Sequence, residues 1–71
     1  MKTTKTQAVL LMYRTLRDSG CLRKEDVLMK VEISDLTFRR YISELRCFFM
    51  NFDEPEEIIY VKAKDAYFLS K

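Results

Sequence analysis

The side chains best suited to binding chemistry lie between positions 34 and 46 of the chain. Arg39 and Arg40 are adjacent, and a guanidinium group can grip guanine with two hydrogen bonds or bind a phosphate. If this segment is a helix, both arginines lie on one side of it, and the apolar residues Phe38, Ile42 and Leu45 lie on the opposite side. The side with the arginines also carries Asp35, Leu36 and Ser43. This spacing predicts a surface that can contact a nucleic acid.

The residues that catalysis or metal binding would need are scarce. The chain has no His, and Cys21 and Cys47 lack the spacing of zinc ligands. Gly20 is the single glycine, so there is no glycine-rich phosphate loop. Neighbouring carboxylates such as Glu56 and Glu57 are more typical of solvated charge than of an acid-base couple. We therefore expect no enzyme activity, no metal and no cofactor, and we interpret both cysteines as reduced thiols that fill the core.

Two helices are expected in the first half of the chain. Thr4-Lys5-Thr6-Gln7 has the spacing of a capping box, so a helix should begin after Thr4, run to about position 18 and end before Gly20. Its buried stripe is predicted from apolar residues that recur every three to four positions: Ala8, Leu11, Met12 and Leu16. A second helix is predicted over 24–31, held by packing because helices below about 12 residues are marginal in water.

A third helix and a hairpin complete the expected fold. Ser34 is a good N-cap, and the third helix is predicted to reach about position 50, before the helix-breaking Pro55. Segments 58–61 and 66–69 are rich in β-branched and aromatic residues, with a turn at 63–65, which indicates a hairpin. This order predicts a single α+β domain over 1–71, a three-helix winged helix-turn-helix with a C-terminal β-hairpin wing.

Segment 33–46 resembles a recognition-helix pattern, Val/Ile-Ser-x-x-Thr-x-x-Arg-x-Ile/Leu-x-x-Leu. This pattern is found in bacterial winged helix-turn-helix regulators of the DeoR and WYL-associated type, and five residues occupy its positions: Ser34, Thr37, Arg40, Ile42 and Leu45. Tyr67-Phe68-Leu69 is similar to the closing wing strand of the same families. The resemblance implies a transcriptional regulator that binds double-stranded DNA, with helix 34–50 in the major groove and the wing 58–69 on the backbone.

The resemblance and the charges suggest roles for single residues. Ser34 and the amides of the first helical turn can meet a phosphate, because a helix N-terminus attracts anions. Lys62 and Lys64 flank the wing tip, where the resemblance implies backbone or minor-groove contact. Lys2 and Lys5 are expected to add phosphate contacts, as is Arg46. The expected DNA-binding set comprises Ser34, Asp35, Leu36, Thr37, Arg39, Arg40, Ser43, Arg46, Lys62 and Lys64.

Departures from the pattern support a rival interpretation. Glu32 stands where the pattern has a turn glycine, and a positive φ is one way for it to fit there. Asp35 and Leu36 replace basic or polar residues, and Asp35 repels phosphate unless it accepts a hydrogen bond from a cytosine amine. The acidic loop 53–57 must point away from phosphates or face a protein. The rival function is a winged-helix protein-interaction module, such as a phage-encoded inhibitor or an assembly subunit.

Charge and hydropathy set the remaining expectations. Residues 1–50 carry ten Lys and Arg against six Asp and Glu, whereas 51–71 carry three against five, so the basic share lies with the helices. No apolar run reaches the roughly 18 to 20 residues of a membrane span, and the first seven residues lack a signal peptide's apolar stretch. We therefore expect a cytoplasmic protein with no membrane partner.

Aromatic residues are concentrated in the second half of the chain. Six of them are interpreted mainly as core rather than as a base-stacking platform: Phe48, Phe49, Phe52, Tyr60, Tyr67 and Phe68. The run Cys47-Phe48-Phe49-Met50 is apolar all around a helix. Region 47–52 is therefore a candidate homodimer contact, with plain solvent exposure as the alternative.

Overall fold

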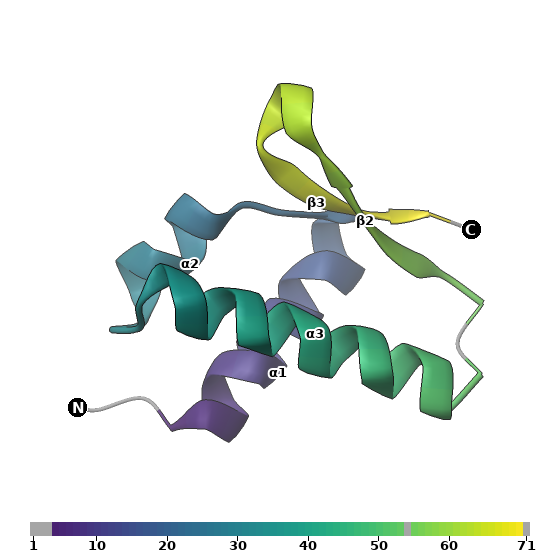
Figure 1. Cartoon of the computed structure of the whole chain (residues 1–71), viewed down its shortest axis with the longest axis horizontal. Coiled ribbons are helices and arrows are strands. Elements are labelled where there is room, and N and C mark those ends of the chain that lie inside the picture. The colour runs from purple at the N-terminus through teal and green to yellow at the C-terminus, as the bar shows by residue number, and fades with distance from the viewer. Residues whose placement is uncertain (1–3, 54, 71) are drawn as a thin grey trace.

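The structure is a computed structural model that describes residues 4–53 and 55–70 (Figure 1). Its elements in chain order are helix α1 (Lys5–Ser19), strand β1 (Cys21–Leu22), helix α2 (Lys24–Lys30), helix α3 (Asp35–Asn51), strand β2 (Glu57–Val61), the 3-10 turn η1 (Lys62–Lys64) and strand β3 (Ala66–Ser70). The layout is α+β, as predicted, with the three helices and the C-terminal hairpin of a winged helix-turn-helix. The hairpin formed by β2, η1 and β3 is called the wing below.

Local capping explains where the longer helices begin and end. The Thr4 side chain accepts from the Gln7 amide at 3.2 Å, and the Gln7 side chain accepts from the Thr4 amide at 3.4 Å. Gly20 ends α1 in the left-handed conformation, at φ 71°. Ser34 Oγ accepts from the Thr37 amide at 3.1 Å at the start of α3. The predicted caps are confirmed, and the predicted helix ends differ from the observed ones by about one residue.

A third strand, β1, was not predicted. The sheet is antiparallel with the order β1-β3-β2, in which Cys21 pairs with Phe68 and Leu22 with Tyr67. The Leu69 amide also donates to the Gly20 carbonyl at 3.1 Å. Because β1 follows α1 directly, these backbone bonds attach the wing to the end of the first helix.

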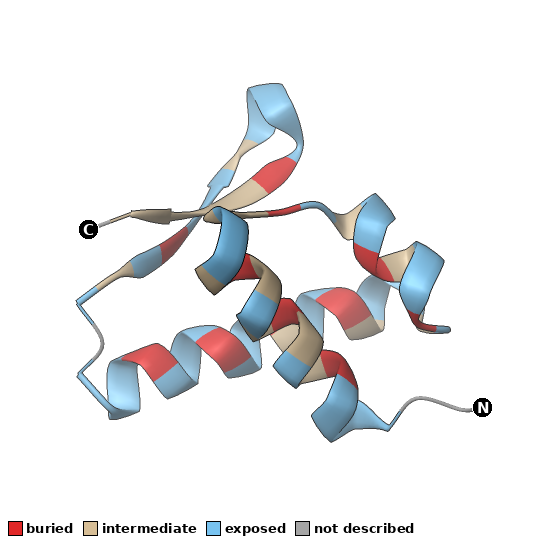
Figure 2. Ribbon diagram, turned by 180° about the vertical axis from the view of Figure 1, so that it is seen from behind, coloured by how far each residue is buried: buried red, intermediate tan, exposed pale blue. Residues whose placement is uncertain are grey.

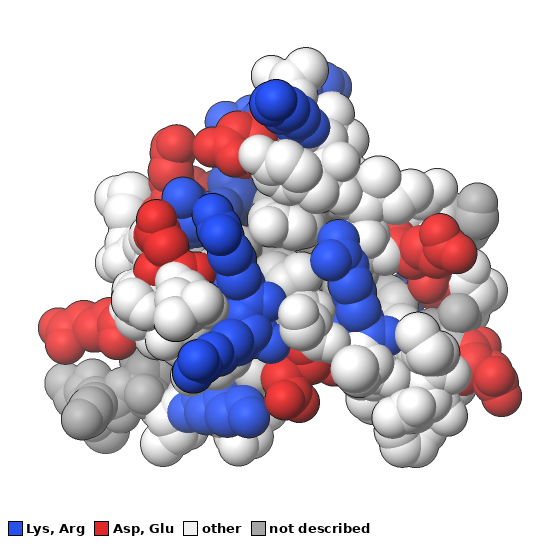
Figure 3. Space-filling view, in the orientation of Figure 1, with Lys and Arg blue, Asp and Glu red and all other residues white. Residues whose placement is uncertain are grey.

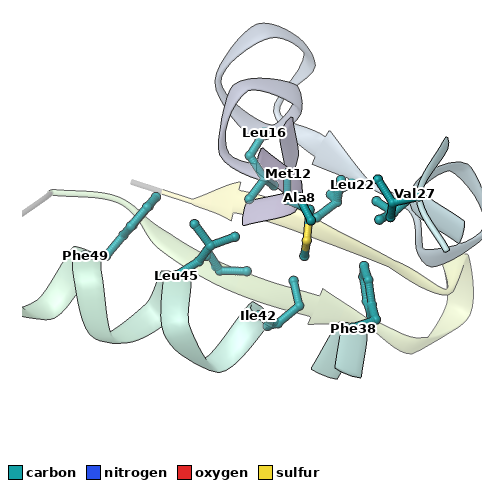
Figure 4. Close-up of a cluster of buried hydrophobic side chains, with 11 residues drawn as sticks. Ala8, Met12, Leu16, Leu22, Val27, Phe38, Ile42, Leu45 and Phe49 are labelled. Carbon is teal, nitrogen blue, oxygen red and sulfur yellow. The ribbon is translucent and has the colours of Figure 1, made fainter. Parts of the chain in front are cut away.

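One hydrophobic core joins the helices to the sheet. Figure 4 shows side chains of α3 pointing toward those of α1 and β1, and Figure 2 shows the buried stripes of the two long helices facing each other. The core consists of Ala8, Met12, Leu16, Leu22, Val27, Val31, Phe38, Ile42, Leu45, Phe49 and Ile58. Since one side of α3 is held in this core, its opposite side stays exposed to solvent.

The link between α2 and α3 is extended rather than left-handed. Val31 follows α2 at φ −133° and ψ 147°. Among the described residues, a positive φ outside glycine occurs at Asp53 and Asp65 alone. The positive φ considered for Glu32 is therefore wrong. Because the chain leaves α2 in an extended conformation that any residue adopts, this connection needs no glycine.

Several side chains expected in the core lie at the surface. Phe49 is buried, but Phe48 is 40% exposed and Phe52 68% exposed. Tyr60 is also exposed, whereas Tyr67 and Phe68 are half-buried. Adjacent residues of a helix point about 100° apart, so Phe48 and Phe49 cannot both face one core. The expectation is therefore wrong for about half of these aromatic residues.

The two cysteines differ in their surroundings. Both are free thiols; Cys21 is half-buried in β1, and Cys47 is exposed on α3. The prediction that both fill the core is therefore wrong for Cys47. Its position four residues after Ser43 places it on the outer side of α3, away from the core.

Candidate nucleic-acid interface

The outer side of α3 carries four of the predicted contact residues. Leu36, Arg39, Arg40 and Ser43 are all exposed. This arrangement follows from helical spacing, because the core residues of α3 occupy the opposite side. In Figure 3, Lys and Arg side chains gather over the front of α3 and at the tip of the wing above it. Asp and Glu side chains lie mostly toward the two sides of this view.

The two adjacent arginines lie beside different neighbours. Arg40 lines a hollow of about 450 Å³ together with Thr37, Ser43 and Lys5. A hydrogen bond to Asp65 raises the pKa of Tyr60 on the wing, and the positive charge of Arg39 opposes this increase. Within residues 4–53 and 55–70, neither arginine forms a hydrogen bond or an ion pair. Both guanidinium groups are therefore available to a ligand.

Three other arginines, unlike the exposed Arg23, are engaged by their neighbours. Arg14 lies 3.5 Å from the Asp18 carboxylate, and Arg17 lies 2.6 Å from that of Glu56. Arg46 donates to the Ile58 carbonyl from Nε at 3.3 Å and from Nη2 at 3.2 Å. Arg46 was expected to contact phosphate, but its guanidinium group holds β2 against α3. The structure therefore separates it from Arg39 and Arg40, whose guanidinium groups have no partner among the described residues.

The polar residues at the start of α3 bond mainly to protein groups. Besides capping the helix, the Ser34 hydroxyl donates to Thr37 Oγ1 at 3.0 Å. Lys24 of α2 lies 3.3 Å from Asp35 Oδ2. The Asp35 side chain is 60% exposed, so this ion pair adds little to stability. It does place a positive charge beside a carboxylate that opposes phosphate binding at this end of the helix.

The wing presents two lysines on a compact turn. Lys62 and Lys64 belong to η1 and are exposed. Asp65 follows in the left-handed conformation, at φ 47° and ψ 51°, and accepts a hydrogen bond from the Tyr60 hydroxyl at 2.7 Å. The Lys64 ammonium lies 5.6 Å from the centre of the Phe68 ring, within cation–π range. These contacts hold the turn, and both lysines remain at the surface beside α3.

We define the basic face as Lys5, Arg39, Arg40, Lys62 and Lys64. Lys5 joins it from the start of α1, where its ammonium lies 3.6 Å from Glu44 Oε1. Lys2, which was also expected to contact phosphate, lies outside the described residues. The basic face thus combines groups from α1, α3 and the wing, which are far apart in the sequence. A surface of this kind attracts a polyanion more strongly than the net charge of +2 alone indicates.

The acidic loop after α3 is directed partly toward α1. The Glu56 side chain is 13% exposed and pairs with Arg17 at the end of α1. Hydrogen bonds with Glu56, and then with Tyr13, raise the pKa of Arg17 above its ordinary value. The Glu56 carboxylate of the loop therefore pairs with Arg17 of α1 and does not extend toward the basic face.

Two residues that contact the candidate interface were not predicted to do so from the sequence, namely Lys24, which pairs with Asp35, and Tyr60, which bonds to Asp65. Lys24 was placed in a helix, but its pairing with Asp35 depends on how α2 packs on α3, and no local pattern signals that. Tyr60 was expected to pack in the core between the helices and the hairpin. It is instead 43% exposed, and its hydroxyl donates to Asp65 at the end of η1.

Comparison with models of protein families, with curated proteins and with solved structures finds no match for this chain. None of the helices in the described part is both long and apolar enough to cross a membrane. Within the same residues, no group of three or more His, Cys, Asp or Glu side chains is placed to hold a metal ion.

Proposed function

We propose that this chain binds double-stranded DNA in a sequence-specific manner as a cytoplasmic transcriptional regulator. The outer side of α3 enters the major groove, and the tip of the wing lies on the backbone. The observation that carries the proposal is the pair Arg39 and Arg40, which are exposed and, among the described residues, unpaired on a helix held from behind by the core. The resemblance of segment 33–46 to DeoR-type and WYL-associated regulators supports the same function.

The arrangement of charges allows some side chains to bind phosphates and others to contact bases. Phosphate contacts supply most of the affinity and fix the register, whereas contacts to base edges select the sequence. The wing, which carries Lys62 and Lys64, lies above α3 in Figure 1, and the start of α1, which carries Lys5, lies below it, so these lysines can reach the two backbones that border a major groove. Arg40 lines a hollow with Lys5 and with Ser43, which lies one turn further along the same side of the helix.

A fluorescence-anisotropy titration with a mixed-sequence duplex tests the proposal. If four lysine and arginine side chains contact phosphates, the affinity should fall roughly 100-fold between 50 and 200 mM salt, because each contact releases counterions. The same titration with single-stranded DNA serves as the control, and selection from a random duplex pool then reports the preferred site. Binding that is absent at low salt, or that does not depend on salt, would contradict the proposal.

Asp35→Asn is expected to strengthen duplex binding about two- to fivefold at low salt, because it removes a negative charge near the phosphates at the start of α3. The change also releases Lys24 from its ion pair. Asp18→Asn is the matched control, since it removes the same charge from an exposed position on α1. Weaker binding of Asp35→Asn in the anisotropy titration would show instead that Asp35 itself accepts a hydrogen bond from a base.

The proposal includes a homodimer, because a symmetric pair of recognition helices matches two half-sites on DNA. Region 47–52, the expected contact, does not form one surface. Phe49 is buried in the core, while Cys47 and Met50 are exposed. Phe48 instead lies against Tyr13 of α1, with ring centres 5.9 Å apart. A second copy can therefore use only part of this region at once.

One observation favours the rival function, a protein-interaction module. Leu36 is 58% exposed on the same side of α3 as the arginines, and an apolar side chain there suits a protein partner as well as a thymine methyl group. The salt titration separates the two functions, because a module that binds only protein shows no duplex affinity at low salt.

A further inference from the structure

An apolar hollow lies between α1 and α3. It has a volume of about 520 Å³, and its lining comes from both helices: Lys5, Thr6, Val9, Leu10, Tyr13, Glu44, Leu45 and Phe48. We call this hollow the α1–α3 groove. Its floor is formed by apolar side chains, and its two charged residues, Lys5 and Glu44, pair with each other at 3.6 Å.

Bulky apolar side chains stand exposed around this groove. Leu10 is 60% exposed on α1, although it lines the groove itself. Phe48 packs against Tyr13 on one side and against Phe52 on the other, with ring centres 5.0 Å apart in the second pair. The surface therefore carries a hollow, a projecting leucine beside it, and an aromatic row that is only partly covered.

We infer that the α1–α3 groove is where a second copy of this chain docks, with Leu10 of each copy filling the groove of the other. A two-fold contact requires one patch that is complementary to itself. Here the projecting residue and the hollow that can receive it belong to the same patch. The inference deepens the proposed function and rests on it for the role of the dimer, which is to present two α3 helices to DNA.

The charges at the groove also favour a copy of the same chain as the occupant. Lys5 and Glu44 contribute one positive and one negative charge, so two such patches meet without a net repulsion. Across a two-fold axis, each Lys5 can face the Glu44 of the other copy as well as its own. An acidic or a basic partner finds no matching excess of charge at this place.

The exposed apolar area is large enough to form the centre of a dimer interface. Around the groove, Leu10, Phe48 and Phe52 leave on the order of 300 Å² of apolar surface exposed, given the usual size of such side chains. A standard interface covers about 800 Å² per partner, roughly a seventh of the 5376 Å² surface of this chain. The patch therefore supplies an apolar centre, and polar side chains of α1 and α3 supply the rim.

Docking at the groove places Lys5 in the dimer contact but leaves Arg39 and Arg40 on the outer side of α3 accessible, so in the dimer the phosphate contacts come from α3 and the wing. The Lys5–Glu44 pair borders both the apolar groove and the polar hollow that contains Arg40 and Ser43. The two hollows thus lie on either side of one ion pair. A second copy seated in the groove covers the flank of α3 next to α1, while the outer side of the helix remains free for DNA.

Sedimentation equilibrium without DNA tests the inference over protein concentrations that span about three orders of magnitude around the micromolar range. The wild-type chain is expected to shift from monomer to dimer, and Leu10→Glu to weaken the dimer at least tenfold. Phe52→Glu, at the other end of the patch, should act in the same direction. Met50→Glu is the matched control, since Met50 is 76% exposed on α3 but lines a different hollow. Circular dichroism checks that each variant is folded.

Each outcome decides between distinct conclusions. Loss of the dimer in Leu10→Glu and Phe52→Glu, with retention in Met50→Glu, supports the inference. A wild-type chain that stays monomeric overturns it, and so does a dimer that both groove variants leave intact or that Met50→Glu disrupts equally. The measurement contains no DNA, so it tests the dimer separately from DNA binding. A chain that dimerises but binds no duplex refutes only the proposed function. A chain that binds duplex as a monomer refutes only this inference.

Discussion

Arg40→Ala is expected to weaken binding to a selected duplex by about 5- to 150-fold, the range that corresponds to loss of one bidentate contact to a base. Arg40 is exposed on the outer side of α3, where it shares a hollow with Thr37 and Ser43, and this is the side of a helix that reaches base edges in a major groove. Anisotropy titrations of the wild-type and variant chains measure this loss directly. They should be repeated with duplexes mutated at each base pair of the selected site, because a base-reading arginine relaxes specificity at one position.

Arg39 is expected to behave differently, since adjacent residues of a helix point about 100° apart and Arg39 does not line the hollow that contains Arg40 and Ser43. We therefore expect Arg39→Ala to weaken all duplexes alike and to reduce the salt slope by about one contact. Arg39→Lys should restore most of the affinity, whereas Arg40→Lys should not, because an ammonium group lacks the two-pronged geometry that guanine requires.

The control for both arginines is Arg14→Ala. Arg14 is 80% exposed on α1, where it pairs with Asp18, so its loss changes the net charge equally without altering the outer side of α3. Its affinity for duplex should stay close to that of the wild-type chain. If the double variant Arg39→Ala and Arg40→Ala bound duplex as tightly as the Arg14→Ala control, α3 would not be the recognition helix.

The features that sequence analysis predicted correctly are those set by near neighbours. The Thr4 capping box, the Ser34 cap and the left-handed Gly20 each depend on residues within four positions, so a local pattern is sufficient. The buried side of α3 follows equally from the repeat of its apolar residues. Helix bounds, the hairpin and the exposed position of Arg39 and Arg40 could therefore be read before the structure was known.

The features that were missed depend on contacts between distant segments. Strand β1 has two residues, too few for an alternating pattern, and it exists because Cys21 and Leu22 pair with β3 at the other end of the chain. The bonds from Arg46 to the Ile58 carbonyl likewise arise from the packing of β2 on α3. Spacing along the sequence gives the direction of a side chain on its own helix, but not the neighbour that it meets.

The aromatic residues illustrate a different limit. Phe48 and Phe49 are equally apolar, and composition alone assigns both to a core. Helical geometry excludes a core position for both, because adjacent residues of a helix point about 100° apart. The same geometry predicts that one of the two rings is exposed. It could not show that Leu10 of α1 lies beside Phe48, so the groove between the helices became visible only in three dimensions.

One fully buried side chain of α3 contributes directly to the contact between this helix and the wing. Phe38 is 0% exposed and immediately precedes Arg39, so it anchors the segment that carries the free arginines. Its ring lies 5.7 Å from that of Tyr67 in β3, which joins α3 to the middle strand of the sheet. Removing this ring leaves a cavity where helix and sheet meet, because a core of this size can relax only in part.

Phe38→Ala is therefore expected to lower the free energy of unfolding by about 3–5 kcal/mol, the usual cost of deleting a buried phenyl ring. A chain of this length has a total stability of roughly 4–10 kcal/mol, so much of it is lost. Urea unfolding followed by circular dichroism measures the change. Leu36→Ala is the control, since Leu36 is 58% exposed on the same helix and should change stability by less than about 0.5 kcal/mol. Equal midpoints for the two variants would contradict the packing of α3 against the wing through Phe38.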